Sequence, residues 1–242
     1  MDLSLFFNLK NMDKTFTISE VIAFGWEKMK NNFLFFAGLL VVVFSIQFFS
    51  SFIAEIFKKG FAPLYMLLII AAWIIQILVR MGAIKITLDV IDKDEKELKT
   101  LFSCSKLLVN FVLGSIVYFL IVLGGLILLI VPGIIWAIKY QFFAYLIIDK
   151  NMGPIEAIKK SGEMTNEKKG KLFLLGIVFV LINIAGLLCF VIGLFATVPT
   201  TMLAVAYVYR KLSSEQVTPE LVENVLPESP VVTEMPVENQ PQ

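Results

Sequence analysis

The amino-acid sequence predicts an all-α membrane protein: a bundle of six transmembrane helices in three hairpins, with amphipathic helices at the membrane interface. Of its 242 residues, 58% are hydrophobic and 17% are charged, against about 45–50% and 25% in soluble domains. The apolar residues also form long runs, each exceeding the ~18 residues that indicate a transmembrane helix. The four runs without Asp, Glu, Lys or Arg are Asn31 to Ala54, Gly60 to Val79, Leu107 to Ile138, and Leu172 to Tyr209.

The first two runs are long enough for one crossing each, and the third is long enough for two. As one helix, the uncharged run from Leu107 to Ile138 would extend about 48 Å, whereas the hydrocarbon core is about 30 Å thick. If one charged residue, Lys139, is allowed within the span, the apolar stretch continues to Ile148 and is long enough for two crossings. We therefore expect a turn at Gly124-Gly125 and a proline kink at Pro132-Gly133 in the returning helix.

The last run predicts a third hairpin. It would extend about 57 Å as a single helix, so we expect a turn between Gly186 and Gly193 and a kink at Pro199. The transmembrane domain is predicted to cover residues 31–212. Its six spans are predicted at residues 33–53, 61–79, 107–123, 126–148, 172–188 and 191–210.

Amphipathic segments precede some of these spans. In the amino-terminal segment, residues 1–30, Thr17 and Glu20 have the spacing of a capping box, and apolar residues then recur at helical spacing up to Met29. Two interpretations stay open: a helix lying in the membrane interface with Trp26 at headgroup depth, or a helix packed on the rest of the protein. A second capped helix is predicted to begin at Asp94 to Glu97 and to lead into the third run.

The distribution of charge predicts the orientation. The net charge of +1 combines a basic body with an acidic, proline-rich tail, residues 213–242, which holds six Glu and no Lys or Arg. A tail of this composition is expected to be disordered. Lys and Arg concentrate before the first span and in residues 80–106 and 139–171. The positive-inside tendency therefore predicts a multi-pass protein of the cell membrane, plasma or inner, with both termini in the cytoplasm.

The residue types argue against an enzyme. The chain has no histidine and only two separated cysteines, Cys104 and Cys189, which predict neither a zinc site nor a disulfide. It also has no Gly-rich phosphate loop and no nucleophile elbow. We expect no catalytic site, no cofactor and no nucleic-acid partner. The expected partner is the lipid bilayer, and a protein partner or a second copy of the chain stays open.

A few polar residues lie inside the predicted spans. Lys139 is the only charge deep in one of them, and an intramembrane charge is a functional hypothesis by default. Because Lys139 lies near a helix end, we favour the interpretation that its side chain reaches the membrane surface. The uncharged polar residues are expected to hydrogen-bond across packed helices. These residues are Gln47, Gln76, Asn110 and Asn183.

An ordered set of motifs resembles a known family. It comprises Gly125 and Val131-Pro132-Gly133-Ile134-Ile135-Trp136, Lys139-Tyr140, Glu156-Ala157-Ile158-Lys159-Lys160-Ser161, and Thr197-Val198-Pro199 followed by Tyr207, Tyr209 and Arg210-Lys211-Leu212. In this order they resemble the glycerophosphoryl diester phosphodiesterase membrane domain and related bacterial membrane proteins. The resemblance implies a helical accessory module without phosphodiesterase activity. The candidate residues are Pro132, Gly133, Lys139, Tyr140, Pro199 and Tyr207.

Two functional hypotheses follow. The first is a structural, accessory or partner-recruiting membrane module. The second is a small-solute transporter or channel, which the expected proline-broken helices and paired hairpins favour. A continuous polar cavity would support the second and a solid apolar core the first. The 22 phenylalanines favour the first, because their bulky rings exclude water.

Overall fold

The computed structural model describes residues 16–57, 62–93, 97–189 and 192–225. Within these ranges every regular element is helical, which confirms the all-α prediction for the described residues. The α-helices are α2 (Ile18–Asn31), α3 (Phe33–Phe57), α4 (Ala62–Asp92), α5 (Leu108–Leu128), α6 (Ile130–Tyr140), α7 (Phe143–Lys150), α8 (Pro154–Met164), α9 (Lys169–Leu188) and α10 (Leu194–Val225). Two 3₁₀ turns, η1 (Leu98–Phe102) and η2 (Ser105–Leu107), precede α5.

Five segments of the described residues are long and apolar enough to cross a membrane. They are Phe33–Ile53, Ala62–Asp92, Leu98–Leu128, Ile130–Lys150 and Lys169–Leu188. Large hydrophobic side chains along these segments are exposed, as expected where lipid is the solvent. The sixth predicted span, residues 191–210, is not among them. Helix α10 begins only at Leu194 and is uncharged only up to Tyr209, about 24 Å of helix.

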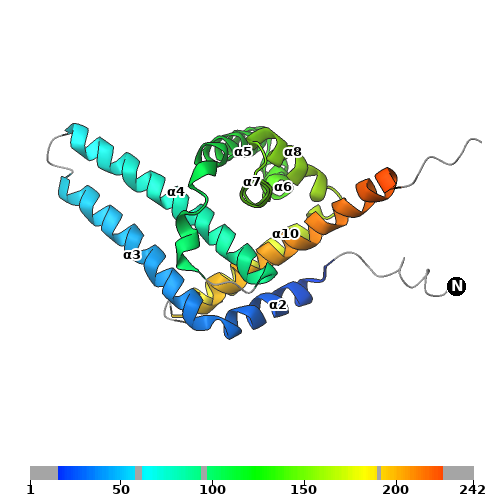
Figure 1. Ribbon diagram of the computed structural model, residues 1–242, viewed down its shortest axis with the longest axis horizontal. Coiled ribbons are helices and arrows are strands. Elements are labelled where there is room, and N and C mark those ends of the chain that lie inside the picture. Colours follow the sequence, from blue (N-terminus) through cyan, green and yellow to red (C-terminus); the bar gives the residue numbers. More distant parts are fainter. Residues whose placement is uncertain (1–15, 58–61, 94–96, 190–191, 226–242) are drawn as a thin grey trace, which may run out of the picture.

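The first hairpin differs from the prediction in the length of its second helix. Helices α3 and α4 lie side by side and form an arm that projects from the rest of the molecule (Figure 1). Helix α4 contains the predicted second span, residues 61–79, from Ala62 onward and continues without interruption beyond Val79 to Asp92. Charged residues do not end a helix, and Lys85 and Asp89 form an i,i+4 ion pair at 2.8 Å that supports the helix.

The second hairpin turns later than predicted. Helix α5 passes through Gly124 and Gly125, and the chain turns at Leu129 in an extended conformation. The predicted turn at Gly124-Gly125 is therefore wrong. Gly125 instead allows close approach of the two helices, since a Cβ there would lie 2.8 Å from the Cα of Gly133. The predicted kink at Pro132-Gly133 is also wrong: Pro132 occupies the first turn of α6, where its missing N–H costs no hydrogen bond.

The returning helix is broken where the sequence predicts continuity. Helix α6 ends at Tyr140, and α7 begins at Phe143, so residues 126–148 are not one helix. The hydroxyls of Ser161 in α8 and of Thr165, the C-cap residue of α8, donate to the Lys139 carbonyl at 3.2 and 2.8 Å. The Phe142 N–H donates to the Ser161 hydroxyl at 3.1 Å. These two side chains thus satisfy backbone groups that the break releases, as a buried break requires.

The third hairpin follows the prediction more closely. Helices α9 and α10 pack together, and the chain between them turns within the interval from Gly186 to Gly193, as predicted. Gly186 contacts Thr197 and Gly193 so closely that a Cβ has no room there. The expected kink at Pro199 does not interrupt α10. The helix continues past the predicted start of the tail at residue 213 to Val225, and residues 226–242 lie outside the described residues.

The amphipathic segments are packed on the protein. The capping box of Thr17 and Glu20 is present, and α2 lies along α10 (Figure 1). Val21, Gly25 and Met29 are buried, so the packed interpretation of this helix is confirmed. For the second predicted helix, residues 94–96 lie outside the described residues. The residues after them form the turns η1 and η2 in place of one continuous helix.

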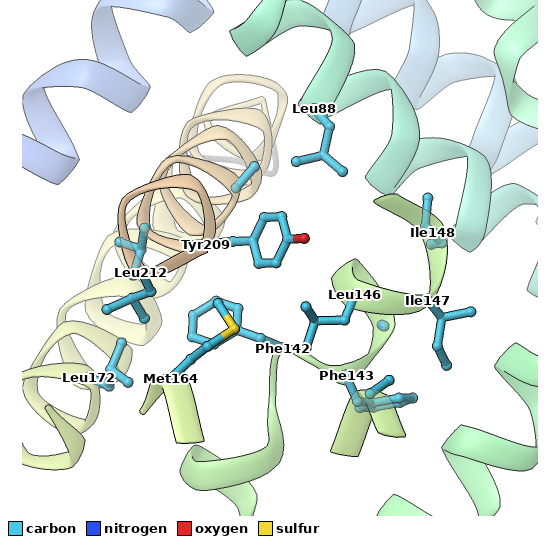
Figure 2. Packing of buried hydrophobic residues seen from close by; sticks show 14 of the residues in the cluster. Leu88, Phe142, Phe143, Leu146, Ile147, Ile148, Met164, Leu172, Tyr209 and Leu212 are labelled. Atoms are coloured by element: carbon cyan, nitrogen blue, oxygen red, sulfur yellow. The ribbon is translucent and has the colours of Figure 1, made fainter. Parts of the chain in front are cut away.

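The largest buried cluster lies where α4, α7, α8 and α10 meet. Figure 2 shows the Tyr209 ring between Leu88 of α4 and the α7 side chains, with Phe142 and Leu146 close by. Tyr209, Leu88 and Leu146 are fully buried, and Phe142 is 1% exposed. This apolar cluster positions the polar contacts described next.

Candidate functional site at the meeting point of three return helices

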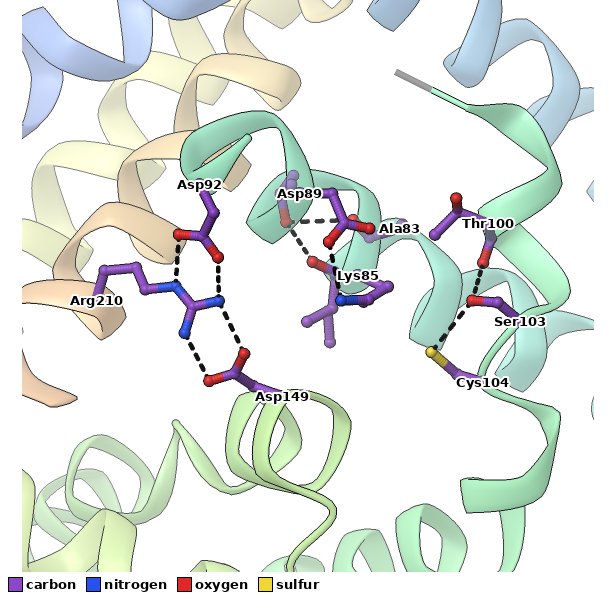
Figure 3. A network of polar contacts seen from close by, with 11 residues as sticks. Ala83, Lys85, Asp89, Asp92, Thr100, Ser103, Cys104, Asp149 and Arg210 are labelled. Carbon is purple, nitrogen blue, oxygen red and sulfur yellow. Dashed lines mark hydrogen bonds and ion pairs between the residues drawn. The ribbon is translucent and has the colours of Figure 1, made fainter. Parts of the chain in front are cut away.

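One arginine joins three helices. We call the second helix of each hairpin a return helix: α4, the broken helix α6–α7, and α10. Arg210 of α10 donates from Nε to Asp92 Oδ1 at 2.9 Å. It also donates from Nη1 and Nη2 to the two oxygens of Asp149 at 2.6 and 2.8 Å. Figure 3 shows its guanidinium between the two carboxylates, at the ends of α4 and α7.

The Arg210 cluster, consisting of Asp92, Asp149, Tyr209 and Arg210, is partly shielded from solvent. The side chains of Arg210 and Asp149 are 26% and 14% exposed. The Tyr209 hydroxyl donates to Asp149 Oδ2 at 2.7 Å, so this carboxylate accepts three hydrogen bonds. Bidentate pairing of a guanidinium with carboxylates is both strong and directional. The arrangement therefore holds the three return helices in one geometry.

Asp92, Asp149 and Arg210 occupy corresponding positions in the three return helices. The tripeptide Ile-Asp-Lys occurs at residues 91–93, at the end of α4, and again at residues 148–150, at the end of α7. In α10 the corresponding place is taken by Tyr209-Arg210-Lys211. Two return helices thus supply an acid and the third supplies the arginine that pairs with both acids.

The short helical segments extend this regularity. Each return helix packs against the segment that opens another hairpin: α4 against η1, α6–α7 against α8, and α10 against α2. A glycine allows each contact, and a Cβ there would meet a neighbour. A Cβ at Gly82 would overlap the Leu101 backbone, and one at Gly25 would overlap the Thr200 carbonyl. A Cβ at Gly162 would contact the Tyr140 ring. The three contacts close a ring of three hairpins around the Arg210 cluster.

A second ion pair ties α2 to α10. Glu20 accepts hydrogen bonds from Lys211 and, at 2.7 Å, from the Tyr207 hydroxyl, and the Tyr207 ring stacks on Phe24 with centroids 4.0 Å apart. The hydrogen bonds from Lys211 and Tyr207 lower the pKa of Glu20 from 4.5 to about 2. The Glu20 and Lys211 side chains are 39% and 35% exposed, so this pair is weaker than the Arg210 cluster.

This shifted pKa predicts a pH dependence. Because the folded state depresses the pKa of Glu20, its contribution to stability is fully present above pH 4.5 and is lost as the pH falls toward 2. Above pH 4.5 we expect the free energy of unfolding of the wild type to exceed that of Glu20→Gln by about 0.2–1 kcal/mol. Near pH 2 the difference is expected to vanish. Chemical unfolding of both proteins across this range measures it.

Glu156→Gln is the matched control, because Glu156 caps α8 through the Gly153 N–H at 3.4 Å without a lysine partner among the described residues. A Glu20→Gln difference that stays constant from pH 4.5 to 2 contradicts the prediction.

The sequence-predicted candidate residues do not meet in one site. Pro132 and Gly133 lie at the α5–α6 turn. Lys139 ends beside Tyr140, its Nζ 5.3 Å from the ring centroid, against α8. Pro199 lies near the start of α10 and Tyr207 against α2.

Sequence reasoning did not identify Arg210, Asp92 and Asp149 as a cluster, because Arg210 entered only as part of the family resemblance. The repeated Ile-Asp-Lys tripeptide was the available signal for the two acids, but nothing in it indicates the arginine partner. Among the described residues, no three His, Cys, Asp or Glu side chains form a group suited to a metal ion.

Comparisons with known proteins give relatives without an assigned role. Over 163 residues the chain is 32% identical to an uncharacterised protein of Mycobacterium bovis, and 32% and 31% identical to uncharacterised proteins from two strains of Mycobacterium tuberculosis. Each match covers 67% of this chain and 48% of the relative. The chain therefore spans about half the length of these relatives. No family model and no solved structure matches the chain, and the resemblance to the phosphodiesterase membrane domain stays a prediction.

Proposed function

We propose that this chain is a six-span, non-enzymatic membrane module that serves as a structural or partner-recruiting scaffold. The observation that supports the proposal is the Arg210 cluster, in which one guanidinium pairs with acids at the ends of two return helices and itself belongs to the third. A scaffold needs fixed helix positions. An alternating-access transporter needs helices that separate on one side of the membrane.

The packing around the cluster favours the same function. The residues that surround it form a closely packed apolar cluster, not a polar path. Tyr209 links the apolar cluster to the Arg210 cluster, since its ring is fully buried while its hydroxyl donates to Asp149. Opening the return helices would expose this ring and break the three hydrogen bonds to Asp149.

In the proposed topology α10 supplies the sixth crossing and both termini are cytoplasmic. The concentration of Lys and Arg in residues 80–106 and 139–171 supports a position of the Arg210 cluster on the cytoplasmic side of the cell membrane. The turns at Leu129 and around Ile192 then lie outside. Both residues are more than two-thirds exposed, as tips of hairpins would be.

Single cysteines at two exposed positions, Lys93 and Lys150, test function and topology together. In a background lacking Cys104 and Cys189, both cysteines should react with a membrane-impermeant thiol reagent in inverted vesicles and not in intact cells. A cysteine at Ile192 should behave oppositely. Spin labels on the Lys93 and Lys150 cysteines in proteoliposomes should then give one narrow distance distribution, because Arg210 joins the ends of α4 and α7.

The Arg210→Met variant carrying the same labels is the control, and its distribution should broaden. Two resolved distances in the wild type would favour the transporter hypothesis over the scaffold. Reaction of the Lys93 and Lys150 cysteines in intact cells would reverse the proposed topology.

A further inference from the structure

A cavity of about 520 Å³ lies between α4, α5, α7 and α10. Much of its wall is apolar, but polar groups enter it from three elements. Arg80 comes from α4, Ser115 and Tyr118 from α5, and Tyr145 from α7. Gln141 joins them from the break between α6 and α7, which α8 stabilises through Ser161 and Thr165. This helix break therefore contributes to the wall of the cavity.

Arg80 is the charged group of this cavity. It belongs to the candidate span Ala62–Asp92, and it forms no hydrogen bond or ion pair with any described residue, in contrast to Lys85 and Arg210. Arg80 lines the same cavity as Tyr118 and Tyr145. An arginine in a membrane-spanning helix is costly without a partner and commonly marks a ligand pathway.

The polar groups around Arg80 have free hydrogen-bonding capacity. Ser115, Gln141 and the Tyr145 hydroxyl make no hydrogen bond with another described side chain or backbone group, whereas the Tyr118 hydroxyl donates to the Ala137 carbonyl at 3.1 Å. Together with the guanidinium they offer several donors to one ligand. Such a set suits an anion with several oxygens, and a guanidinium binds phosphate in a bidentate manner.

A second cavity of about 340 Å³ adjoins the first and shares Arg80, Ala83 and Met202 with it. Apart from Gln47, Gln76 and Arg80, its lining is apolar and comes from α3, α4 and α10. Arg80 thus lies between a polar and an apolar compartment. Its side chain is exposed, so a molecule in the bilayer has access to it.

We propose that these two cavities bind one anionic phospholipid, with its phosphate on Arg80 and an acyl chain in the apolar compartment. Tyr145, Ser115 and Gln141 supply further donors to the headgroup. The lipid supplies the charge partner that Arg80 lacks among the described residues. This inference is independent of the proposed scaffold function, because the cavities contain no residue of the Arg210 cluster.

Lipid retention tests the proposal. The full chain, purified in a non-ionic detergent, is incubated with micelles containing phosphatidylglycerol and phosphatidylcholine, and the lipid retained after gel filtration is quantified by native mass spectrometry. The wild type is expected to retain phosphatidylglycerol preferentially. Loss of a charge-assisted pair predicts that Arg80→Gln binds this lipid roughly tenfold or more weakly, while Arg80→Lys retains part of the affinity.

Lys99→Gln, which removes an exposed charge on η1, is the matched control and should bind as the wild type does. Melting temperature and elution volume report whether each variant is folded. If Arg80→Gln does not fold, the Tyr145→Phe variant is tested in its place. It removes only one hydroxyl and should still weaken the retention of phosphatidylglycerol.

Two results overturn the proposal. One is equal retention of phosphatidylglycerol by the wild type and a folded Arg80→Gln variant. If Arg80→Gln does not fold, the same result for Tyr145→Phe overturns the proposal. The other is complete displacement of the lipid by millimolar inorganic phosphate, which would assign the site to a free anion.

Discussion

Replacing Arg210 by Met is expected to lower the free energy of unfolding by about 2–4 kcal/mol, somewhat below the loss typical of a fully buried ion pair. The substitution leaves Asp92 and Asp149 without their shared partner, and Asp149 is only 14% exposed. Unfolding in mixed detergent and dodecyl sulfate micelles, followed by far-UV circular dichroism, measures the change.

Lys211→Met is the matched control for this experiment. Lys211 is the next residue and also pairs with an acid, but both partners are about one-third exposed or more. Its loss is expected to cost about 0.2–1 kcal/mol. The triple variant Asp92→Asn, Asp149→Asn, Arg210→Met should recover part of the Arg210→Met loss, because it no longer leaves unpaired carboxylates. Equal effects of Arg210→Met and Lys211→Met would contradict the central role of Arg210.

Replacing Gly82 by Ala is expected to destabilise the protein by about 1–3 kcal/mol, the range found for overpacked cores. A Cβ at Gly82 would overlap the backbone of Leu101 in η1. The backbone cannot yield as a flexible side chain can, so η1 must move away from α4. Leu101, which is 2% exposed, would then lose its packing. The same unfolding experiment applies, and hydrogen exchange of residues 98–107 should become faster.

Gly38→Ala in α3 is the control for Gly82→Ala. No atom outside its own helix turn lies within 4 Å of a Cβ at Gly38, and alanine is favoured over glycine in a helix by about 0.5–1 kcal/mol. This variant should therefore be neutral or slightly stabilising. A Gly82→Ala protein as stable as Gly38→Ala, with unchanged exchange in residues 98–107, would show that the η1 contact tolerates a side chain.

The features that local sequence determined are those that depend on neighbouring residues alone. Long uncharged runs predicted the all-helical class and a span within each of the five candidate membrane-spanning segments, because the length of apolar helix needed to cross a bilayer is a property of the run itself. The capping box of Thr17 and Glu20 is equally local, since both residues lie within one helical turn. The turn between Gly186 and Gly193 was predicted because the run was too long for one crossing.

Tertiary structure decided the features whose residues find partners far away in the chain. Gly124-Gly125 has the composition of a turn, but Gly125 is a helical contact because Gly133 packs on it. The break after Tyr140 has no local signal, since the groups that stabilise it are hydroxyls of Ser161 and Thr165 in another helix.

The residues of the candidate site and of the cavity also find their partners far away in the chain. Asp149 has the sequence features of a solvated charge at a span edge, and only the fold brings Arg210 to it from 61 positions along the chain. Arg80 was placed outside the second span because its charge suggested an end. Its position inside α4, beside Gln141 and Tyr145, follows from the packing of four helices. Local patterns determined which segments are helical and apolar, whereas hydrogen bonds, charge pairs and close glycine contacts between distant segments determined where those helices end and which residues meet.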